Sequence, residues 1–525
     1  MMISIDVRTA SLAAFMAFPP AGLAMAGDGP TVGLIESSPD AAAGYTLFTP
    51  LNSMPTYLID LHGELVNSWM DDAPGGNSVY LLEDGSLLRC SDEGPAKGSV
   101  LIAGGDGSNV KRFDWEGNLV WNFSYNTPEH RLHHDIAPMP NGNILMIAWE
   151  YKSAAQAIQA GRDPSALASD SLWPLHIIEV EPVGATGGDV VWEWNLWDHL
   201  VQDFDPTKDN YGVVADHPGK VDVNYRRNDN GDWIHANGID YNPALDQIVI
   251  STPFLSEAWI INHGITSEEA AGPAGDLLYR WGNPQVYDRG TAADQTLFFN
   301  HDVAWVDEGL PGAGNLTVFN NGNGRPDGAY STIEEFTPPL NGDGTYTLPK
   351  GGAYGPESAS MIYIADPSTS FYSSGLSGVQ RLANGNTLFC KGRNSGASPR
   401  GGEFYEVDPD GEVVWLYVNP VGPSGVLTQG DDPNGLQNAF RCSRYAPDFA
   451  GFEGRDLTPT GPIELPADDP CPADLNGDGQ VNGADVGLML AFWGEPGAGD
   501  LNGDGTTNGA DVGLLLAAWG PCSTP

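Results

Sequence analysis

A three-residue pattern recurs along the chain: a polar residue, a small or polar one, then an apolar one that opens a short hydrophobic run. Its six copies begin at Asn77, His134, Asn237, His301, Ser377 and Asn438. In four copies a turn and a hydrophobic strand follow at once, with turns at 83–86, 140–143, 242–243 and 383–386. A recurring unit with a turn inside it is typical of a repeat architecture, where the same position of each repeat faces the same place.

A second element precedes most of these copies: an apolar strand with an acidic residue, a glycine turn, and another strand. Clear examples span 57–66, 113–121 and 406–415, degenerate ones 178–194 and 259–281, and the weakest 332–347. Each unit thus offers four strands, and six units predict an all-β fold, a six-bladed β-propeller over residues 27–456. The six triplets should then meet at the mouth of the central channel, and insertions at 151–172 and 201–230 should form loops over it.

Charge and the N-terminal segment narrow the class of protein. The chain has 525 residues with 69 Asp and Glu against 23 Lys and Arg, a net charge of −46. Such an acidic surface disfavours nucleic acid and anionic membranes as partners. Residues 1–26 resemble a signal peptide, with Arg8, an apolar stretch over 11–23 and Ala24-Met25-Ala26 as a cleavage site. No other run approaches a membrane span, so we expect a secreted, periplasmic or cell-surface protein.

The five cysteines suit an oxidising compartment. Cys471 and Cys522 bracket the C-terminal segment and suggest a disulfide clasp. Cys90 and Cys390 fall in predicted strands, and they and Cys442 are expected to be buried structural residues.

The C-terminal segment, 471–522, follows a Pro- and Asp-rich linker at 457–470 and carries two copies of one acidic loop, each followed by a short apolar helix, 486–493 and 512–519. Oxygen ligands at loop positions 1, 3, 5, 9 and 12, with glycine at position 6, match what Ca²⁺ requires. The loops resemble dockerin type I repeats of paired EF-hand-type loop–helix units, and the resemblance implies Ca²⁺ binding and a cohesin-type protein partner. The candidate ligands are Asp474, Asn476, Asp478, Gln480, Asn482, Asp485, Asp500, Asn502, Asp504, Thr506, Asn508 and Asp511.

Three histidines are the candidate chemistry of the propeller. His134 and His301 occupy the first position of their triplets, and His235 lies two residues before Asn237, on the same face if the segment is a strand. A neutral imidazole is a competent nucleophile and a protonated one stabilises an oxyanion. Three imidazoles also suit zinc or copper.

The segments around these histidines, 131–136, 232–241 and 298–303, resemble the arylsulfotransferase (ASST) family in motif and order, and the likeness spans about residues 40–465. The family's members are six-bladed propellers that move a sulfuryl group from a phenolic sulfate donor to a phenol acceptor through a sulfohistidine. By this resemblance His301 is the nucleophile, His235 and His134 are oxyanion and leaving-group partners, and Asn237 orients the group.

One position departs from the family pattern. Where members carry an arginine on the strand after the second histidine, this chain has Pro253. Arg325 is the candidate substitute for the missing cation, and Arg131 is a weaker one. Two other functions therefore stay open: a metal-dependent hydrolase or lyase with the three histidines as ligands, and a non-catalytic binding propeller displayed through its dockerin-like module.

Overall fold

The computed structural model describes residues 29–522, apart from 168, 227–229, 397, 399, 434, 468–470, 477, 495–498, 500 and 502–505. The expected signal peptide, residues 1–26, lies outside the described residues. No helix in the described part of the chain is both long and apolar enough to cross a bilayer.

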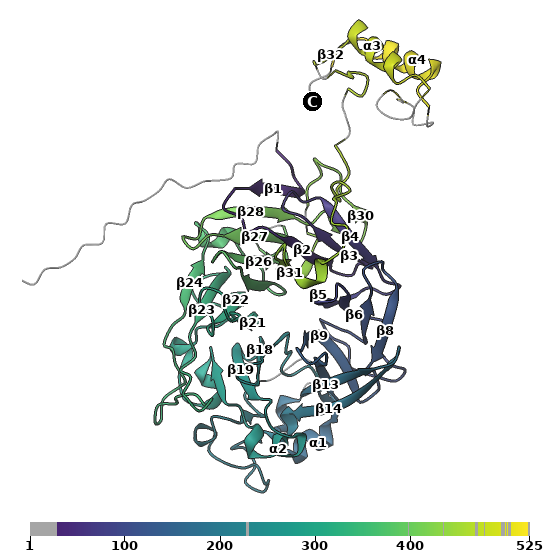
Figure 1. The fold of residues 1–525 in the computed structure, drawn as a ribbon. Helices are drawn as coiled ribbons and strands as arrows, with labels where there is room; N and C mark the ends of the chain where they lie inside the picture. The colour runs from purple at the N-terminus through teal and green to yellow at the C-terminus, as the bar shows by residue number, and fades with distance from the viewer. Residues whose placement is uncertain are drawn as a thin grey trace, which may run out of the picture. The chain divides into compact units, whose positions relative to one another are not determined.

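Six antiparallel sheets of four or five strands surround a central channel (Figure 1). The innermost strand of each sheet contacts the innermost strand of the next, which closes the ring. Each of the six innermost strands contains its triplet or begins within one residue of the triplet's first position, so the predicted six-bladed propeller is confirmed. These strands are β5 (Gly75–Leu81), β9 (His130–Pro138), β17 (Gly238–Asn242), β21 (His301–Trp305), β25 (Gly378–Arg381) and β31 (Ala439–Tyr445).

The remaining strands of each blade follow in chain order from the channel outward. The second strands are β2 (Tyr45–Pro50), β6 (Leu87–Ser91), β10 (Ile144–Glu150), β18 (Gln247–Thr252), β22 (Leu316–Asn320) and β26 (Thr387–Lys391). The third strands are β3 (Pro55–Ile59), β7 (Asn109–Phe113), β13 (Leu175–Val183), β19 (Glu257–Asn262), β23 (Thr332–Phe336) and β27 (Glu403–Val407). The outermost are β4 (Leu65–Met70), β8 (Leu119–Ser124), β14 (Gly187–Asn195), β20 (Tyr279–Trp281), β24 (Ser360–Tyr363) and β28 (Val413–Val418).

Two features differ from the sequence prediction. The fifth blade takes its outermost strand from β24, not from the 332–347 hairpin, because segment 337–359 loops out before the chain returns to β23. The blade of β25–β28 gains a fifth strand, since β1 (Gly33–Ser37) pairs with β28. The first blade is closed by β31, which pairs with β2 and so joins the two ends of the propeller.

Apolar side chains fill the space between neighbouring blades. One cluster joins Leu88 and Val110 to Ile136 and Met146 of the next blade, and another joins Ile260 and Val249 to strands β21 and β22. Alternate residues of each strand point to opposite faces, and second strands such as β6, β18 and β22 are buried along their whole length.

Short elements complete the propeller. Both insertions contribute: Arg162 donates to the Val223 carbonyl and so joins 151–172 to 201–230. The remaining elements are β11 (Lys152–Ser153), α1 (Ala154–Gln159), β12 (Ser171–Leu172), β15 (Leu200–Val201), β16 (Val221–Asp222), α2 (Ser267–Ala270), β29 (Val421–Gly422) and β30 (Gly425–Val426).

The chain divides into two compact units, one of residues 1–425 with 432–463 and one of 426–431 with 464–525. The second contains β32 (Gln480–Val481), α3 (Gly483–Ala491), α4 (Gly509–Ala517) and β33 (Gly520–Pro521). The predicted Cys471–Cys522 disulfide is present, and Cys90, Cys390 and Cys442 are buried free thiols as expected. The helices begin three residues earlier than predicted because Asn482 and Asn508 cap them from within the loops.

Candidate active site

The three predicted histidines lie in, or just before, three successive innermost strands. His134 is in β9, His301 opens β21, and His235 lies three residues before β17. The rings of His134 and His235 meet edge to face, with centroids 4.5 Å apart. His134 and His301 are each 3% exposed, whereas the side chain of His235 is 13% exposed.

Backbone conformation, rather than strand alternation, brings two of these side chains to the mouth. His134 has a φ of 53° and His235 a φ of 55°, in the left-handed region that non-glycine residues rarely adopt. The expectation that strand alternation relates His235 to Asn237 is therefore wrong, because residue 235 lies in an irregular segment before β17. Such conformations cluster at functional sites, where the surrounding structure holds them at a cost of about 1–3 kcal/mol each.

His134 lies beneath the loop that precedes β7. Its backbone N–H donates to the Gly105 carbonyl at 2.8 Å. A Cβ on Gly105 would lie 2.0 Å from His134 Nε2, so only glycine allows this approach. Arg131 anchors the same loop through Asp92, Asp106 and the Leu101 carbonyl. Arg131 is therefore a structural residue and not the missing cation.

His235 is held by a buried carboxylate. Its Nδ1 is hydrogen-bonded to Asp232 Oδ2, and Trp149 Nε1 donates to the other oxygen of Asp232 at 3.0 Å. Trp149 in turn stacks on His133, whose Nδ1 lies 3.0 Å from Nδ1 of His134. A continuous buried assembly thus supports both mouth histidines from behind.

Aromatic rings form one wall beside His235. Phe254, which follows Pro253, stacks on the His235 ring with centroids 4.4 Å apart and lies 5.5 Å from Phe299. The guanidinium of Arg226, from the second insertion, lies 3.7 Å from the Phe254 centroid. Since both partners are stacked this closely on one ring, they lie on its opposite faces. Arg226 therefore supports the wall from behind.

His301 has an amide partner instead of a carboxylate. Asn321 Nδ2 donates to the carbonyls of Ser373 and Leu376, so its Oδ1 is the atom that accepts from His301 Nδ1, at 2.8 Å. The proton is thereby fixed on Nδ1, and Nε2 carries the lone pair. That lone pair accepts the backbone N–H of Leu376 at 3.0 Å.

Burial keeps the imidazoles of His301, His133 and His134 neutral. Desolvation lowers the pKa of His301 to about 3 and that of His133 to about 3. The pKa of His134 is also well below its ordinary value, first through burial and then through the neighbouring His235. A neutral imidazole with a fixed Nδ1 proton has its nucleophilic lone pair on Nε2.

The aspartates of the two His-Asp triplets are structural. Asp135 accepts the N–H of Ile239, and Asp302 accepts the N–H of Val379, so each ties its blade to the following one. Arg441 of β31 joins them, with 2.6 Å to Asp135 and 3.1 Å to Asp302, and also donates to the Asn237 carbonyl. Burial raises the pKa of Asp302 to about 6 despite this partner.

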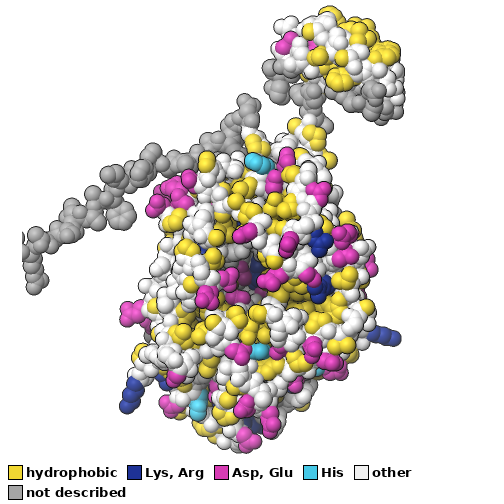
Figure 2. Space-filling model, viewed as in Figure 1, with side chains coloured by type: hydrophobic (Ala, Val, Ile, Leu, Met, Phe, Trp, Pro, Cys, Tyr) yellow, Lys and Arg dark blue, Asp and Glu magenta, His cyan; other side chains and the backbone are white. Residues whose placement is uncertain are grey.

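A cavity of about 210 Å³ lies further along the channel and is lined by Tyr80, Asp240, Asp302 and Arg441 but by none of the three histidines. Burial raises the pKa of Asp240 to about 7. Figure 2 shows that the propeller face in view is hollowed at its centre and that acidic side chains gather around the hollow.

The two other predicted propeller residues are placed differently. Asn237 is fully buried, and its Nδ2 donates to the Asn300 carbonyl, while its Oδ1 has no hydrogen-bond partner among the described residues. Arg325 donates to Thr332 and lies 3.8 Å from Glu334, in the turn between β22 and β23. The described contacts do not bring Arg325 to the histidines.

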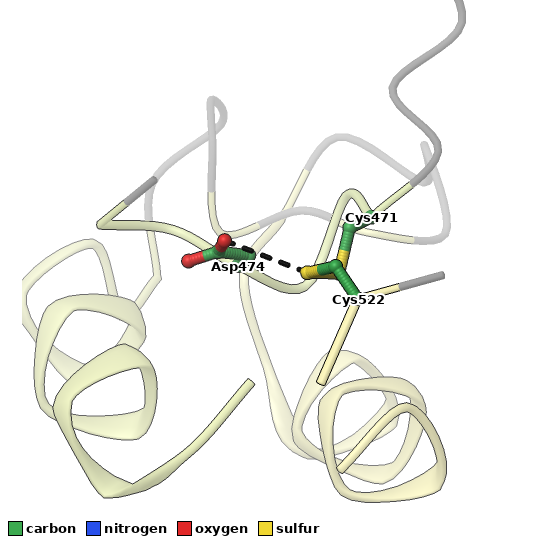
Figure 3. A group of neighbouring side chains, drawn as sticks. All are labelled: Cys471, Asp474 and Cys522. Carbon is green, nitrogen blue, oxygen red and sulfur yellow. Dashed lines mark hydrogen bonds between the residues drawn. A yellow bond between two sulfur atoms is a disulfide. The ribbon is translucent and has the colours of Figure 1, made fainter. Parts of the chain in front are cut away.

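The geometry does not favour the metal-centre hypothesis for the histidines. Within the described residues, one set of three His, Cys, Asp or Glu ligand atoms lies within 4.8 Å of one another, namely Cys471, Asp474 and Cys522. Figure 3 shows that its two sulfurs form the disulfide, with Asp474 beside it. The nitrogens of His301 are both hydrogen-bonded, so a metal would have to displace Leu376 or Asn321.

The acidic loops are described in part. In the first, Asp474 accepts the N–H groups of Asp478 and Gly479, and Asp485 accepts those of Asn476 and Asn482. Asn482 caps α3 with its side chain, and Gln480 is exposed. In the second, Asn508 and Asp511 repeat the cap of α4 and Thr506 is described, whereas Asp500, Asn502 and Asp504 lie outside the described residues.

Sequence reasoning missed Asp232, Phe254, Arg226 and Arg441 as parts of this region. Asp232 was within reach, since an acidic residue three positions before a candidate histidine in a turn is a frequent orienting partner. The other three come from distant segments, and no local pattern marks them.

Fold and site together define a class: a β-propeller with histidines in, or just before, three of its innermost strands. The particular family follows from a family model, Arylsulfotransferase (ASST), which matches residues 45–337, more than half of the chain. This protein therefore belongs to the arylsulfotransferase family. A search of curated proteins gave no match.

Solved structures are similar at low identity. The β-propeller domain of Cps50 (Swd1) from Myceliophteria thermophila is 11% identical, with 73% of this chain and 89% of that chain covered and a TM-score of 0.36. Hydrazine synthase of Kuenenia stuttgartiensis is 17% identical, with 57% and 69% covered and a TM-score of 0.33. Regucalcin from Agrobacterium tumefaciens is 10% identical, with 78% and 97% covered and a TM-score of 0.31.

Proposed function

We propose that this protein transfers a sulfuryl group from an aryl sulfate to a phenol through a sulfohistidine at His301. The observation that carries the proposal is the set of three histidines in, or just before, three successive innermost strands, in a chain of the arylsulfotransferase family. His301 is neutral, and its Nδ1 proton is fixed by Asn321. These are the properties required of an imidazole nucleophile.

The reaction then has two balanced steps. His301 Nε2 attacks the sulfur of the aryl sulfate, the N–S bond forms, and the S–O bond to the departing phenolate breaks while that oxygen receives a proton. In the second step an acceptor phenol loses its proton, its oxygen attacks the same sulfur, and the N–S bond breaks. His134 and His235, whose ring centroids lie 4.5 Å apart, hold the sulfuryl oxygens and transfer the proton to and from the phenolic oxygen.

Two features of the site bear on substrate binding. The Leu376 N–H covers the His301 lone pair, so it must move before Nε2 reaches sulfur. Phe254 and Phe299 form the aromatic wall next to the most exposed histidine, His235. His235 and Arg226 cover the two faces of Phe254, so its edge and the ring of Phe299 are the aromatic surface offered to a substrate. Such a surface fits phenols better than aliphatic alcohols.

Intact mass measurement after incubation with an aryl sulfate tests the proposal. We expect wild-type protein to gain one sulfuryl group and to lose it when a phenol is added. The matched control is His263→Ala, which removes a histidine that pairs with Asp246 and Glu179 between two blades and should form the same adduct. Bound zinc or copper without an adduct would replace the proposal by a metalloenzyme, and neither result would leave a binding propeller.

We also propose that the protein is exported and that residues 471–522 form a Ca²⁺-binding, dockerin-like module that docks on a cohesin-type partner. In the described loop the carboxylates of Asp474 and Asp485 turn inward onto loop amides, a donor set of hard oxygens that suits Ca²⁺. The two capped helices repeat the same geometry, as a duplicated module requires.

Calcium titration of the full-length protein tests this module. We expect two Ca²⁺ ions per chain, and we expect Asp474→Ala with Asp500→Ala to abolish binding. Thermal unfolding of the propeller should not change in that variant, because the propeller and the C-terminal segment belong to two different compact units. Undiminished calcium binding by the double variant would contradict the assignment.

A further inference from the structure

We infer that Asp232 is a positioning residue that fixes the tautomer of His235 and balances its charge, so that His235 is the histidine that carries the proton during transfer. The inference rests on the proposed function and names a role within that site. Asp232 is 1% exposed, and both of its carboxylate oxygens are hydrogen-bonded to site-forming side chains.

The hydrogen-bond pattern distinguishes His235 from its neighbours. The Nδ1 of His134 faces the ring nitrogen of His133, and that of His301 faces the amide of Asn321. Only His235, among these three, has a carboxylate at Nδ1. With Nδ1–H donated to Asp232, the Nε2 atom of His235 is left for the substrate, on the most exposed ring of the three.

Asp232 is held so that it stays ionised. Although burial alone would raise it, the pKa of Asp232 is lowered by His235, by His133 and by the N–H of Trp149. An ionised carboxylate stabilises the imidazolium that forms when Nε2 takes a proton, without itself accepting that proton. The neutral Asn321 offers His301 no such counter-charge.

In this scheme His235 transfers the proton and His301 accepts the sulfuryl group. In the first step His235, as imidazolium, gives its Nε2 proton to the departing phenolate oxygen while His301 accepts sulfur. In the second step neutral His235 takes the proton of the acceptor phenol, and the site returns to its starting charge. Asp232 contacts neither substrate and acts through His235 alone.

The other ionisable groups around His235 do not supply this counter-charge. The ring of His134 meets the ring of His235 from β9. His133 and His301 interact with His235 through charge, since His235 contributes to the lowered pKa of each. Arg226 lies behind Phe254, and Arg441 acts on His134 and His301 from β31. These neighbours are histidines and arginines, so Asp232 is the one carboxylate hydrogen-bonded to the ring in the described residues.

The test compares Asp232→Asn with Asp246→Asn in the full-length protein. Both variants replace a carboxylate that meets a histidine Nδ1, but Asp246 pairs with His263, outside the site. We expect Asp232→Asn to lower kcat/KM for the aryl sulfate by about 10²–10³-fold and to move the basic limb of that pH profile to lower pH, because the imidazolium that donates the proton loses its counter-charge. Asp232→Glu should recover part of the rate, and Asp246→Asn should match wild type.

A second readout separates this inference from the proposed function. In ¹⁵N-histidine spectra recorded at a pH where His235 is neutral, and assigned with His235→Gln, we expect an Nδ1–H tautomer for His235 in wild type and its loss in Asp232→Asn. Wild-type turnover with an unchanged pH profile in Asp232→Asn would overturn the inference and leave sulfuryl transfer standing. Absence of turnover and adduct in wild type, with the tautomer change present, would overturn the function and leave the positioning role.

Discussion

His235 and His301 belong to the same channel mouth, yet their surroundings are opposite in kind. Nδ1 of His235 meets the carboxylate of Asp232, and that of His301 meets the amide of Asn321. The side chain of His235 is 13% exposed, whereas the Nε2 of His301 is covered by a backbone N–H. A carboxylate and an amide are different partners for an imidazole, and this difference fits the two roles proposed above for these histidines.

The largest expected effect separates the two tasks directly. His301→Ala should abolish both sulfuryl transfer and the covalent adduct, because no other group takes the sulfur. His235→Ala and His134→Ala should still form an adduct, with rates lower by about 10²–10³-fold. Intact mass and steady-state rates on the three variants provide the measurement. An adduct on His301→Ala would reverse the roles assigned here.

A smaller effect concerns acid stability. The pKa of His301 is about 3 in the folded protein and 6.5 as an unperturbed group, so the unfolded chain binds more protons between these values. The free energy of unfolding therefore does not depend on this proton above about pH 6.5. It falls as the pH is lowered toward 3, by up to about 1.4 kcal/mol per pH unit.

His301→Gln should lack this loss. We therefore expect the free energy of unfolding, measured in urea at pH 7, 6 and 5, to fall more steeply in wild type than in the variant. Parallel curves would show that His301 is protonated as readily in the folded protein as in the unfolded chain, which would remove its distinction from a carboxylate-paired histidine.

The smallest expected effect concerns the cation that the family pattern places where Pro253 stands. Arg325 is engaged by Thr332 and Glu334 and stacks over Tyr330. Arg325→Ala should therefore change kcat/KM by less than about threefold while it lowers stability slightly. A loss of 10²-fold or more in the variant's kcat/KM would instead assign Arg325 to the sulfuryl oxygens.

The sequence predicted the architecture because its signals are local. Turns such as Asn141-Gly142 and the alternation of the strands they join mark the inner hairpin of a blade. Strand β24 was not predicted as part of its blade because a long segment separates it from β23. Strand β1 was not predicted because its partner, β28, is far away in the chain. Pairing between distant segments leaves no periodic trace.

The site was predicted in part for the same reason. The triplet pattern found His134 and His301, which lie within strands β9 and β21. His235 lies before β17 in a left-handed backbone conformation that no periodicity describes. Its support by Trp149 depends on contacts across 83 positions of the chain, which only the folded structure brings together.

Arg441 reaches from β31 to groups on β5, β9, β21 and the residue before β17, and it thereby spans the channel between the histidines and the 210 Å³ cavity beyond. In the sulfuryl transfer proposed above, donor and acceptor would then approach His301 from the same side of Arg441, each in its own half-reaction. That mechanism predicts ping-pong kinetics, with parallel double-reciprocal plots as the signature.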